Sequence, residues 1–251
     1  MNDGRNQEGF TPMKAHLLEL KRRLTIALLA YFLGVLVLMN YSSIMYDILS
    51  LPLRQVLPEG SPMVFIGAPD VFFTYLKIAL VVGLFASSPI TMYQFWAFIA
   101  PALYRHERRA FFGYTLSSVV LLLVGGFFAY FVVFPLAFAF FLGFANEHIQ
   151  AMPAVREYLD FALKLLFAFG LSFQIPIVLM LLSRMELIDP ENLAKKRRFV
   201  VLWIFVFGAL LTPPDVISQI MLAIPMLVLF EIGLFLARLA RKRALATKNI
   251  A

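Results

Sequence analysis

Six apolar runs dominate the chain, and the short polar segments between them hold most of its charges. The runs cover residues 24–41, 71–99, 110–144, 159–182, 199–211 and 216–236. A helix that crosses the hydrocarbon core of a bilayer needs about 20 predominantly apolar residues. The pattern therefore predicts an all-α, polytopic integral membrane protein with six transmembrane helices.

Two helix-start signals lie outside these runs. Thr11-Pro12 and Asp189-Pro190 each place a capping side chain before a proline, which is tolerated at the first position of a helix. The residues after Pro12 place leucines on one helical face and charges on the other. We expect three parts: an amphipathic cytoplasmic segment 1–23, a six-helix transmembrane domain 24–237 and a basic cytoplasmic tail 238–251.

The last two predicted spans are short. Residues 199–211 would form a helix about 20 Å long, whereas the hydrocarbon core is about 30 Å thick. In the sixth span, only residues 220–230 are apolar without interruption, between Gln219 and Glu231. Short spans thin the bilayer or lie against longer neighbours. We expect two short helices beside four longer ones, in a locally thinned membrane.

The basic residues predict the orientation. Of 22 lysines and arginines, 18 lie in the N-terminal segment, in the second and fourth loops, or in the C-terminal tail. The other four are Arg54, Lys77, Arg156 and Lys164. Because basic residues accumulate on the cytoplasmic side, both termini are expected there. The net charge of +7 then reflects topology and contact with membrane lipid, not nucleic-acid binding.

Composition narrows the class further. Apolar residues make up 61 % of the chain and charged residues 15 %, too apolar a balance for a soluble domain. The chain has no cysteine, its three histidines are isolated, and it carries no phosphate-binding loop or nucleophile motif. We expect no metal, no cofactor and no enzymatic activity. A secondary transporter of a small solute stays open, although that class needs more polar groups at mid-membrane.

Two carboxylates stand among basic residues on the predicted cytoplasmic side. Glu19 precedes Lys21 and two arginines, and Glu107 lies between Arg105 and Arg109. Either acid can form an ordinary helical salt bridge, such as Glu19 with Arg23. Either can instead accept an arginine from a partner in a bidentate pair. The aromatic stretch 95–104 lies before Glu107, and it is either a membrane-interface anchor or an apolar groove for a peptide.

Polar residues inside the predicted spans are functional candidates, because unpaired polar groups are costly in lipid. Gln174 lies near mid-depth, where it bonds either to a partner helix or within the subunit. Lys77 is expected to extend toward the interface. Thr212, Asp215 and Gln219 form a polar group at the junction of the short helices, where Asp215 is a candidate helix cap.

Several stretches resemble the TatC family, the polytopic receptor subunit of the twin-arginine protein translocase. The resemblance covers about residues 12–240 in order. It is carried by HLLELKRR (16–23), AFIAPALYRHERR (97–109), FAYFVVFPLAF (128–138), LLTPPDV (210–216), AIPM (223–226) and FEIG (230–233).

The resemblance implies a cupped six-helix protein of the inner membrane that binds signal peptides with paired arginines. Glu19 and Glu107 match the acids that engage those arginines, and Lys21, Phe98, Pro101 and Leu103 belong to the same site. Gln174, Thr212 and Gln219 match positions that dock the single-span subunits TatA and TatB in a multimeric complex. Pro52 and Asp215 match outer-face positions that transport requires. The proton-motive force supplies the energy, and no covalent bond is broken.

Two residues depart from the family pattern. Gln174 stands where many relatives have a glutamate, so a proton-linked role does not transfer to it, whereas hydrogen bonding does. Lys21 stands where relatives often have arginine, which keeps the charge but not the planar fork.

Overall fold

The computed structural model describes residues 10–57, 63–67, 69–99, 108–144, 152–211 and 216–248. Within these ranges the chain is helical apart from turns, short connections and one isolated bridge between Val64 and Ala154. The elements are α1 (Phe10–Met39), α2 (Ser42–Arg54), α3 (Asp70–Ile99), α4 (Arg108–Phe128), the π-helical turn η2 (Ala129–Val133), α5 (Phe134–Leu142), α6 (Val155–Ser172), α7 (Ile175–Arg184), α8 (Pro190–Lys195), α9 (Arg197–Leu211) and α10 (Val216–Lys248).

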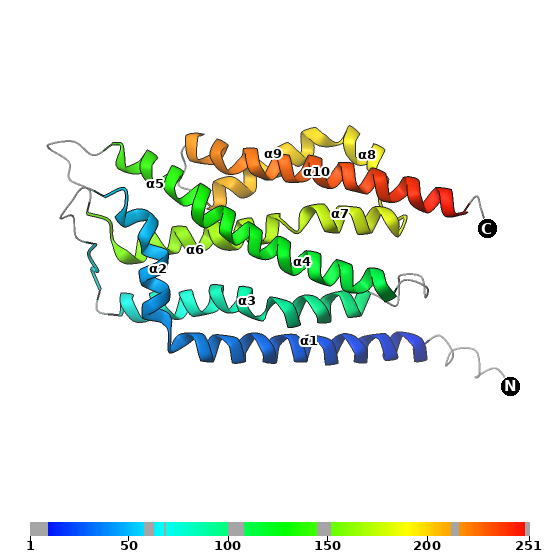
Figure 1. The fold of residues 1–251 in the computed structure, drawn as a ribbon, viewed down its shortest axis with the longest axis horizontal. Coiled ribbons are helices and arrows are strands. Elements are labelled where there is room, and N and C mark those ends of the chain that lie inside the picture. Colours follow the sequence, from blue (N-terminus) through cyan, green and yellow to red (C-terminus); the bar gives the residue numbers. More distant parts are fainter. Residues whose placement is uncertain are drawn as a thin grey trace.

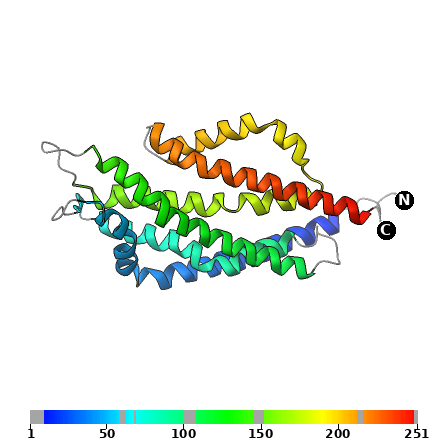
Figure 2. The same ribbon diagram turned by 45° about the horizontal axis from the view of Figure 1, so that its top comes forward.

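The long helices run roughly side by side, and the start of α1 and the end of α10 lie at the same end of the molecule (Figure 1). We call this the terminal end. The short helix α2 lies across the opposite end, which we call the α2 end. Helix α1 lies at one edge, along α3, and the pair α9 and α10 lies at the other (Figures 1 and 2). The six predicted spans run along the molecule in alternating directions, and an even number of spans brings the chain back to the end where it started.

Each of the six predicted spans coincides with helix. Five stretches are long and apolar enough to cross a membrane, namely His16–Met39, Asp70–Ile99, Phe111–Leu142, Val155–Arg184 and Val216–Lys242. The sixth, α9, has only 15 residues, which agrees with the short fifth span predicted. The prediction of an all-α polytopic fold is therefore confirmed.

The helix boundaries differ from the prediction at two places. Helix α2 was not predicted, because residues 42–54 mix polar and apolar positions and contain Pro52. Helix α10 has 33 residues and continues to Lys248, well past the predicted end at Leu236. Its last turns are rich in alanine, leucine, lysine and arginine, which favour helix. The apolar run 220–230 stays short, but the helix that contains it is long.

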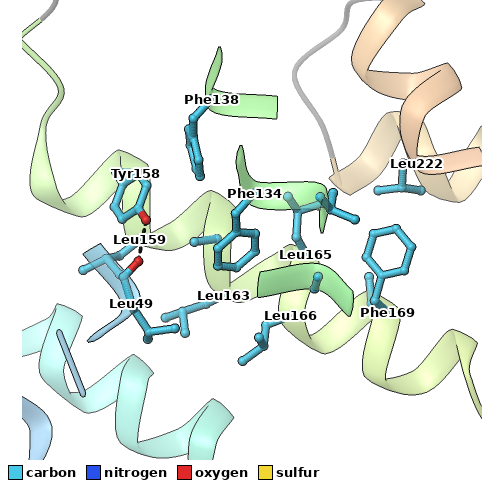
Figure 3. Packing of buried hydrophobic residues seen from close by; sticks show 14 of the residues in the cluster. Leu49, Phe134, Phe138, Tyr158, Leu159, Leu163, Leu165, Leu166, Phe169 and Leu222 are labelled. Atoms are coloured by element: carbon cyan, nitrogen blue, oxygen red, sulfur yellow. Dashed lines mark hydrogen bonds between the residues drawn. The ribbon is translucent and has the colours of Figure 1, made fainter. Parts of the chain in front are cut away.

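The core lies between α2, α5, α6 and the start of α10 (Figure 3). Phe134 and Phe169 are completely buried there, and Leu222 of α10 packs close to Phe169. Elsewhere small residues let helices approach closely. A Cβ added at Gly83 of α3 would lie 2.7 Å from a Val35 methyl carbon of α1. Small residues at helix contacts are typical of membrane proteins, in which dispersion holds helices together.

The π-helical turn η2 comes just before Pro135. Proline has no N–H, so it cannot continue the regular pattern of helical hydrogen bonds. In a regular helix, residue 135 would donate to the carbonyl of Phe131, four residues earlier. Just before the proline, the Phe134 N–H donates to the carbonyl of Ala129, five residues earlier. The turn that carries Tyr130 therefore contains one extra residue, and such π-helical turns are frequent at functional sites.

Candidate functional site

Glu19 forms the local ion pair that its sequence position suggested. Arg23, one turn later in α1, donates from Nε at 3.0 Å and from Nη2 at 2.7 Å. Both bonds reach Glu19 Oε1, so this pair leaves Oε2 unused. The Glu19 side chain is 37 % exposed and that of Arg23 is 26 % exposed. Glu19 is therefore a half-exposed carboxylate whose geometry is fixed through one oxygen.

The start of α1 is held against the end of α3 at the terminal end. Arg23 Nη1 donates to Gln94 Oε1 at 3.4 Å. The rings of His16 and Phe98 stack with their centroids 4.6 Å apart and their planes at 25°. Two predicted site residues, Glu19 and Phe98, are thus brought to the same end of the molecule. Sequence reasoning gave no role to Gln94 or His16, although His16 begins one of the motifs it used.

Other residues predicted for this site are not joined to it by a described contact. Lys21 is exposed on α1. Glu107, Pro101 and Leu103 lie outside the described residues.

Gln174 takes part in an internal polar contact. It lies between α6 and α7, and its Nε2 donates to the backbone carbonyl of Ser118 in α4 at 2.9 Å. The Ser118 hydroxyl in turn accepts from Trp96 Nε1 of α3 at 2.8 Å. This arrangement supports the internal-packing interpretation and leaves partner docking as a prediction.

Gln219 joins the two helices at the α9 and α10 edge. Its Nε2 donates to the carbonyl of Phe205 at 2.7 Å, and its side chain lies against Gly208. A glycine at that position lets the side chain of Gln219 reach the backbone of α9. Thr212 and Asp215, predicted to share this polar group, lie outside the described residues.

Pro52 has a structural consequence at the α2 end. A proline inside a helix leaves the carbonyl four residues earlier without its N–H partner, and that carbonyl belongs to Ile48. The Tyr130 hydroxyl of η2 donates to it at 2.7 Å. The next carbonyl, that of Leu49, accepts from the hydroxyl of Tyr158 in α6 (Figure 3). Two tyrosine hydroxyls therefore anchor α2, and sequence reasoning identified neither.

Ion pairs connect α3 to α6 near the α2 end. Lys77 Nζ lies 2.6 Å and 2.8 Å from the two oxygens of Asp160. The expectation that Lys77 simply extends to the interface was therefore wrong, because a carboxylate on α6 holds it. A second ion pair joins the same two helices closer to the α2 end, where Arg156 Nη1 of α6 lies 2.9 Å from Asp70 Oδ1 of α3. These pairs draw two parallel helices together.

A second group of ion pairs lies at the terminal end. Glu231 of α10 pairs with Arg197 at 2.7 Å, and Arg238 pairs with Glu191 of α8 at 2.9 Å. Arg241 pairs with Asp189.

The side chain of Asp189 also accepts the Glu191 N–H at 3.0 Å. The predicted cap at Asp189-Pro190 is thereby confirmed, because Asp189 accepts that N–H at the start of α8.

The fold and these contacts define the class, a multi-pass helical membrane protein with ion pairs near both of its ends. The family model described as Sec-independent protein translocase protein (TatC) matches residues 15–225. The chain belongs to the TatC family, and it is thus a protein-translocase component with a role in transport.

Individual relatives and a solved structure agree with this assignment. The TatC protein of Desulforapulum autotrophicum is 43 % identical over 237 residues, which cover 94 % of this chain and 88 % of the relative. The Escherichia coli K12 protein is 46 % identical over 231 residues, 92 % of this chain and 90 % of the relative. A crystal structure of the twin-arginine translocase receptor TatC superposes with a TM-score of 0.82 at 41 % identity, covering 90 % of this chain and 99 % of that one.

Proposed function

We propose that this chain is the receptor and core subunit of a twin-arginine translocase. It binds the paired arginines of signal peptides on folded cargo proteins at its terminal end. Family membership and the likeness to a structure named as that receptor support the assignment. Both termini are then cytoplasmic, as the distribution of basic residues predicts, and the membrane is the inner membrane.

One observation carries the peptide-binding part of this proposal. Arg23 engages Glu19 through Oε1, leaving Oε2 to face an arriving guanidinium. A carboxylate and a guanidinium form charge-assisted hydrogen bonds, which are stronger than neutral ones. His16 lies about one turn before Glu19 on α1 and stacks on Phe98, and this aromatic pair offers surface to the apolar segment after the arginines. We assign the second carboxylate to Glu107, and we assign Lys21, Pro101 and Leu103 to the same peptide site.

The partner subunits are the single-span proteins TatA and TatB, in a multimeric complex within membrane lipid. We assign their docking to Gln174, Thr212 and Gln219, and an outer-face role to Pro52 and Asp215. The outward face of α9, the helix to which Gln219 bonds, is where we expect a single-span partner to lie. Several of its large apolar residues are exposed in the isolated chain, and they are Phe199, Leu202, Trp203, Val206, Phe207 and Leu210.

The subunit moves cargo with energy from the proton-motive force and breaks no covalent bond, and it needs no cofactor or metal. The alternative, a transporter of a small solute, gains no support from the contacts. That class needs polar groups converging at mid-membrane, whereas the Gln174 amide donates to a neighbouring helix.

Charge reversal tests the proposal. Glu19→Lys or Glu107→Lys should abolish export of a reporter with a twin-arginine tag, because a lysine repels the arginines of the tag, while the protein still accumulates in the membrane. Glu157→Lys at the α2 end is a matched control and should leave export intact. Normal export in both variants would refute the receptor assignment.

Crosslinking locates the site directly. A photoreactive group at Phe98 or Leu103 should crosslink to a twin-arginine peptide and not to a twin-lysine control, because a lysine lacks the planar fork. Equal crosslinking of both peptides would show that the paired arginines are not what is recognised.

A further inference from the structure

The α2 end carries basic residues in a part of the protein that is expected to avoid them. With the termini cytoplasmic, as proposed, this end lies in the outer half of the membrane, where the described chain has four basic side chains. Three are in ion pairs: Arg54 with Asp47 at 3.2 Å, Arg156 with Asp70 at 2.9 Å and Lys77 with Asp160 at 2.6 Å. The fourth is Lys164.

Lys164 is not paired with Asp160, the acid that its own helix places one turn earlier. It follows Asp160 by four residues, and an acid four residues before a lysine normally pairs with it on a helix surface. Here both oxygens of Asp160 bond to Lys77 of α3, at 2.6 and 2.8 Å. Within the described residues Lys164 makes no ion pair, and its side chain is exposed. The bond between α3 and α6 thus leaves a cation on the exposed face of α6.

The depth of Lys164 indicates which anion it meets. It comes nine residues after the start of α6 at Val155, or about 14 Å along the helix. That position lies below the headgroups in a bilayer about 40 Å thick in total. A charge there is costly in hydrocarbon, so a lysine extends toward the interface. Helical side chains lean toward the N-terminus of their helix, and for α6 this direction leads to the outer surface, where lipid phosphates lie.

We propose that Lys164 binds the phosphate of an outer-leaflet phospholipid, and that Lys77 keeps it available by holding Asp160. The site takes a phosphodiester headgroup beside α3 and α6. It rests on the proposed orientation of the termini and not on peptide binding at the terminal end.

Native mass spectrometry of the purified full-length chain with added phosphatidylglycerol tests this site. Lys164→Gln should lower the retained phospholipid about tenfold, which corresponds to the loss of one charge-assisted hydrogen bond. Lys164→Arg should retain it. Arg54→Gln is the matched control, because it removes another outer cation that is already paired. Equal retention by Lys164→Gln and the unchanged chain would overturn the proposal.

The two halves of the ion pair provide a sharper test. Lys77→Met frees Asp160 to pair with Lys164, so retention should fall as it does in Lys164→Gln. Asp160→Asn frees Lys77 as a second cation, so retention should rise. If the ion pair only fastened α3 to α6, both variants would change retention in the same direction, and that result would overturn the proposed control of Lys164.

Two further measurements distinguish this lipid site from a free-anion site and from the peptide site at the terminal end. Inorganic phosphate at the same concentration should not displace the lipid, and displacement would point to a free-anion site instead. Glu19→Gln should leave lipid retention unchanged, while Lys164→Gln should leave binding of a twin-arginine peptide unchanged. Failure of the lipid site would therefore leave the receptor assignment intact.

Discussion

At the scale of single residues, the position of Arg23 determines which carboxylate oxygen of Glu19 is available to an arginine of the signal peptide. Arg23 divides its guanidinium between Glu19 of its own helix and Gln94 of α3. The contact with Gln94 holds one Nη away from the carboxylate. Without it, Arg23 is free to turn and occupy both oxygens of Glu19 in a bidentate pair.

Gln94→Leu should therefore weaken binding of a twin-arginine peptide about two- to fivefold, the loss expected from competition worth ~0.5–1 kcal/mol. Peptide titration with the purified chain measures it. Gln94→Glu is the control, because a carboxylate holds Arg23 more firmly and should preserve or tighten binding. Tighter binding by Gln94→Leu would contradict this role for Gln94.

Gln174 has two interpretations, internal packing through its bond to the Ser118 carbonyl and docking of a partner subunit. Gln174→Leu removes its bond to α4 and should destabilise the protein by about 1 kcal/mol. If Gln174 also docks a partner, recovery of TatA and TatB with the purified chain should fall. Ser118→Ala provides the comparison, since it keeps the backbone carbonyl that Gln174 uses and loses only the bond to Trp96. Unchanged partner recovery in Gln174→Leu would make the residue internal packing alone.

Residue identity predicted the site only in part. The charges around Glu19 and the motif beside Phe98 could be read from the sequence, because ionisable groups and long motifs are visible there. Gln94 could not be predicted, since nothing local indicates that α3 brings it to Arg23. Asp160 was missed for the same reason, and its local partner by spacing, Lys164, is not the one it takes.

At the scale of elements, α2 depends on a missing hydrogen bond. Pro52 leaves the Ile48 carbonyl without its helical N–H partner. Tyr130, in the π-helical turn before Pro135, donates its hydroxyl to that carbonyl. Two prolines far apart in sequence therefore produce one contact. Apolar periodicity revealed the long helices and the short α9. It revealed neither α2 nor η2, whose geometry comes from backbone groups and not from side-chain pattern.

A double-mutant cycle tests this contact. Tyr130→Phe should cost about 1 kcal/mol of unfolding free energy, the value of a typical hydrogen bond. In the background of Pro52→Ala the cost should shrink, because residue 52 then donates its own N–H to Ile48. Thermal unfolding of the four proteins gives the coupling. Tyr31→Phe, which loses a 3.1 Å bond to Leu80 of α3, is the control and should be additive with Pro52→Ala. Additivity of Tyr130→Phe would exclude the proposed link.

At the scale of the whole molecule, ion pairs join the last third of the chain into one unit. Helix α10 is much longer than α9, and its extension lies against α8 at the terminal end (Figure 1). The extension past Leu236 was not predicted, because a polar segment after an apolar run looks like a tail until acids on a neighbouring helix are known to meet it. Arg238 and Arg241 find such acids in Glu191 and Asp189.

Arg238→Glu should therefore loosen α8, because it places a carboxylate beside Glu191. A protease that cuts only after lysine should then cleave after Lys195 or Lys196 about threefold faster, in line with the modest energy of an exposed ion pair. Adding Glu191→Arg should restore the original rate by recreating the pair with reversed sign. Lys242→Glu makes the same charge change on an exposed residue and serves as the control. A cleavage rate that the second substitution does not restore would argue against the pair.

The placement of α1 at the edge of the molecule has a mechanical consequence. Its packing is almost entirely along α3, and the backbones approach closely near Gly34 and Gly83. Glu19 lies 15 residues from Gly34, or about 22 Å along the axis. A pivot of about 5° at the glycine contact would swing the Glu19 carboxylate by about 2 Å. Because Arg23 bonds to Gln94 and His16 stacks on Phe98 at this end of α1, such a tilt has to break both contacts, and together they fix the position of the acid.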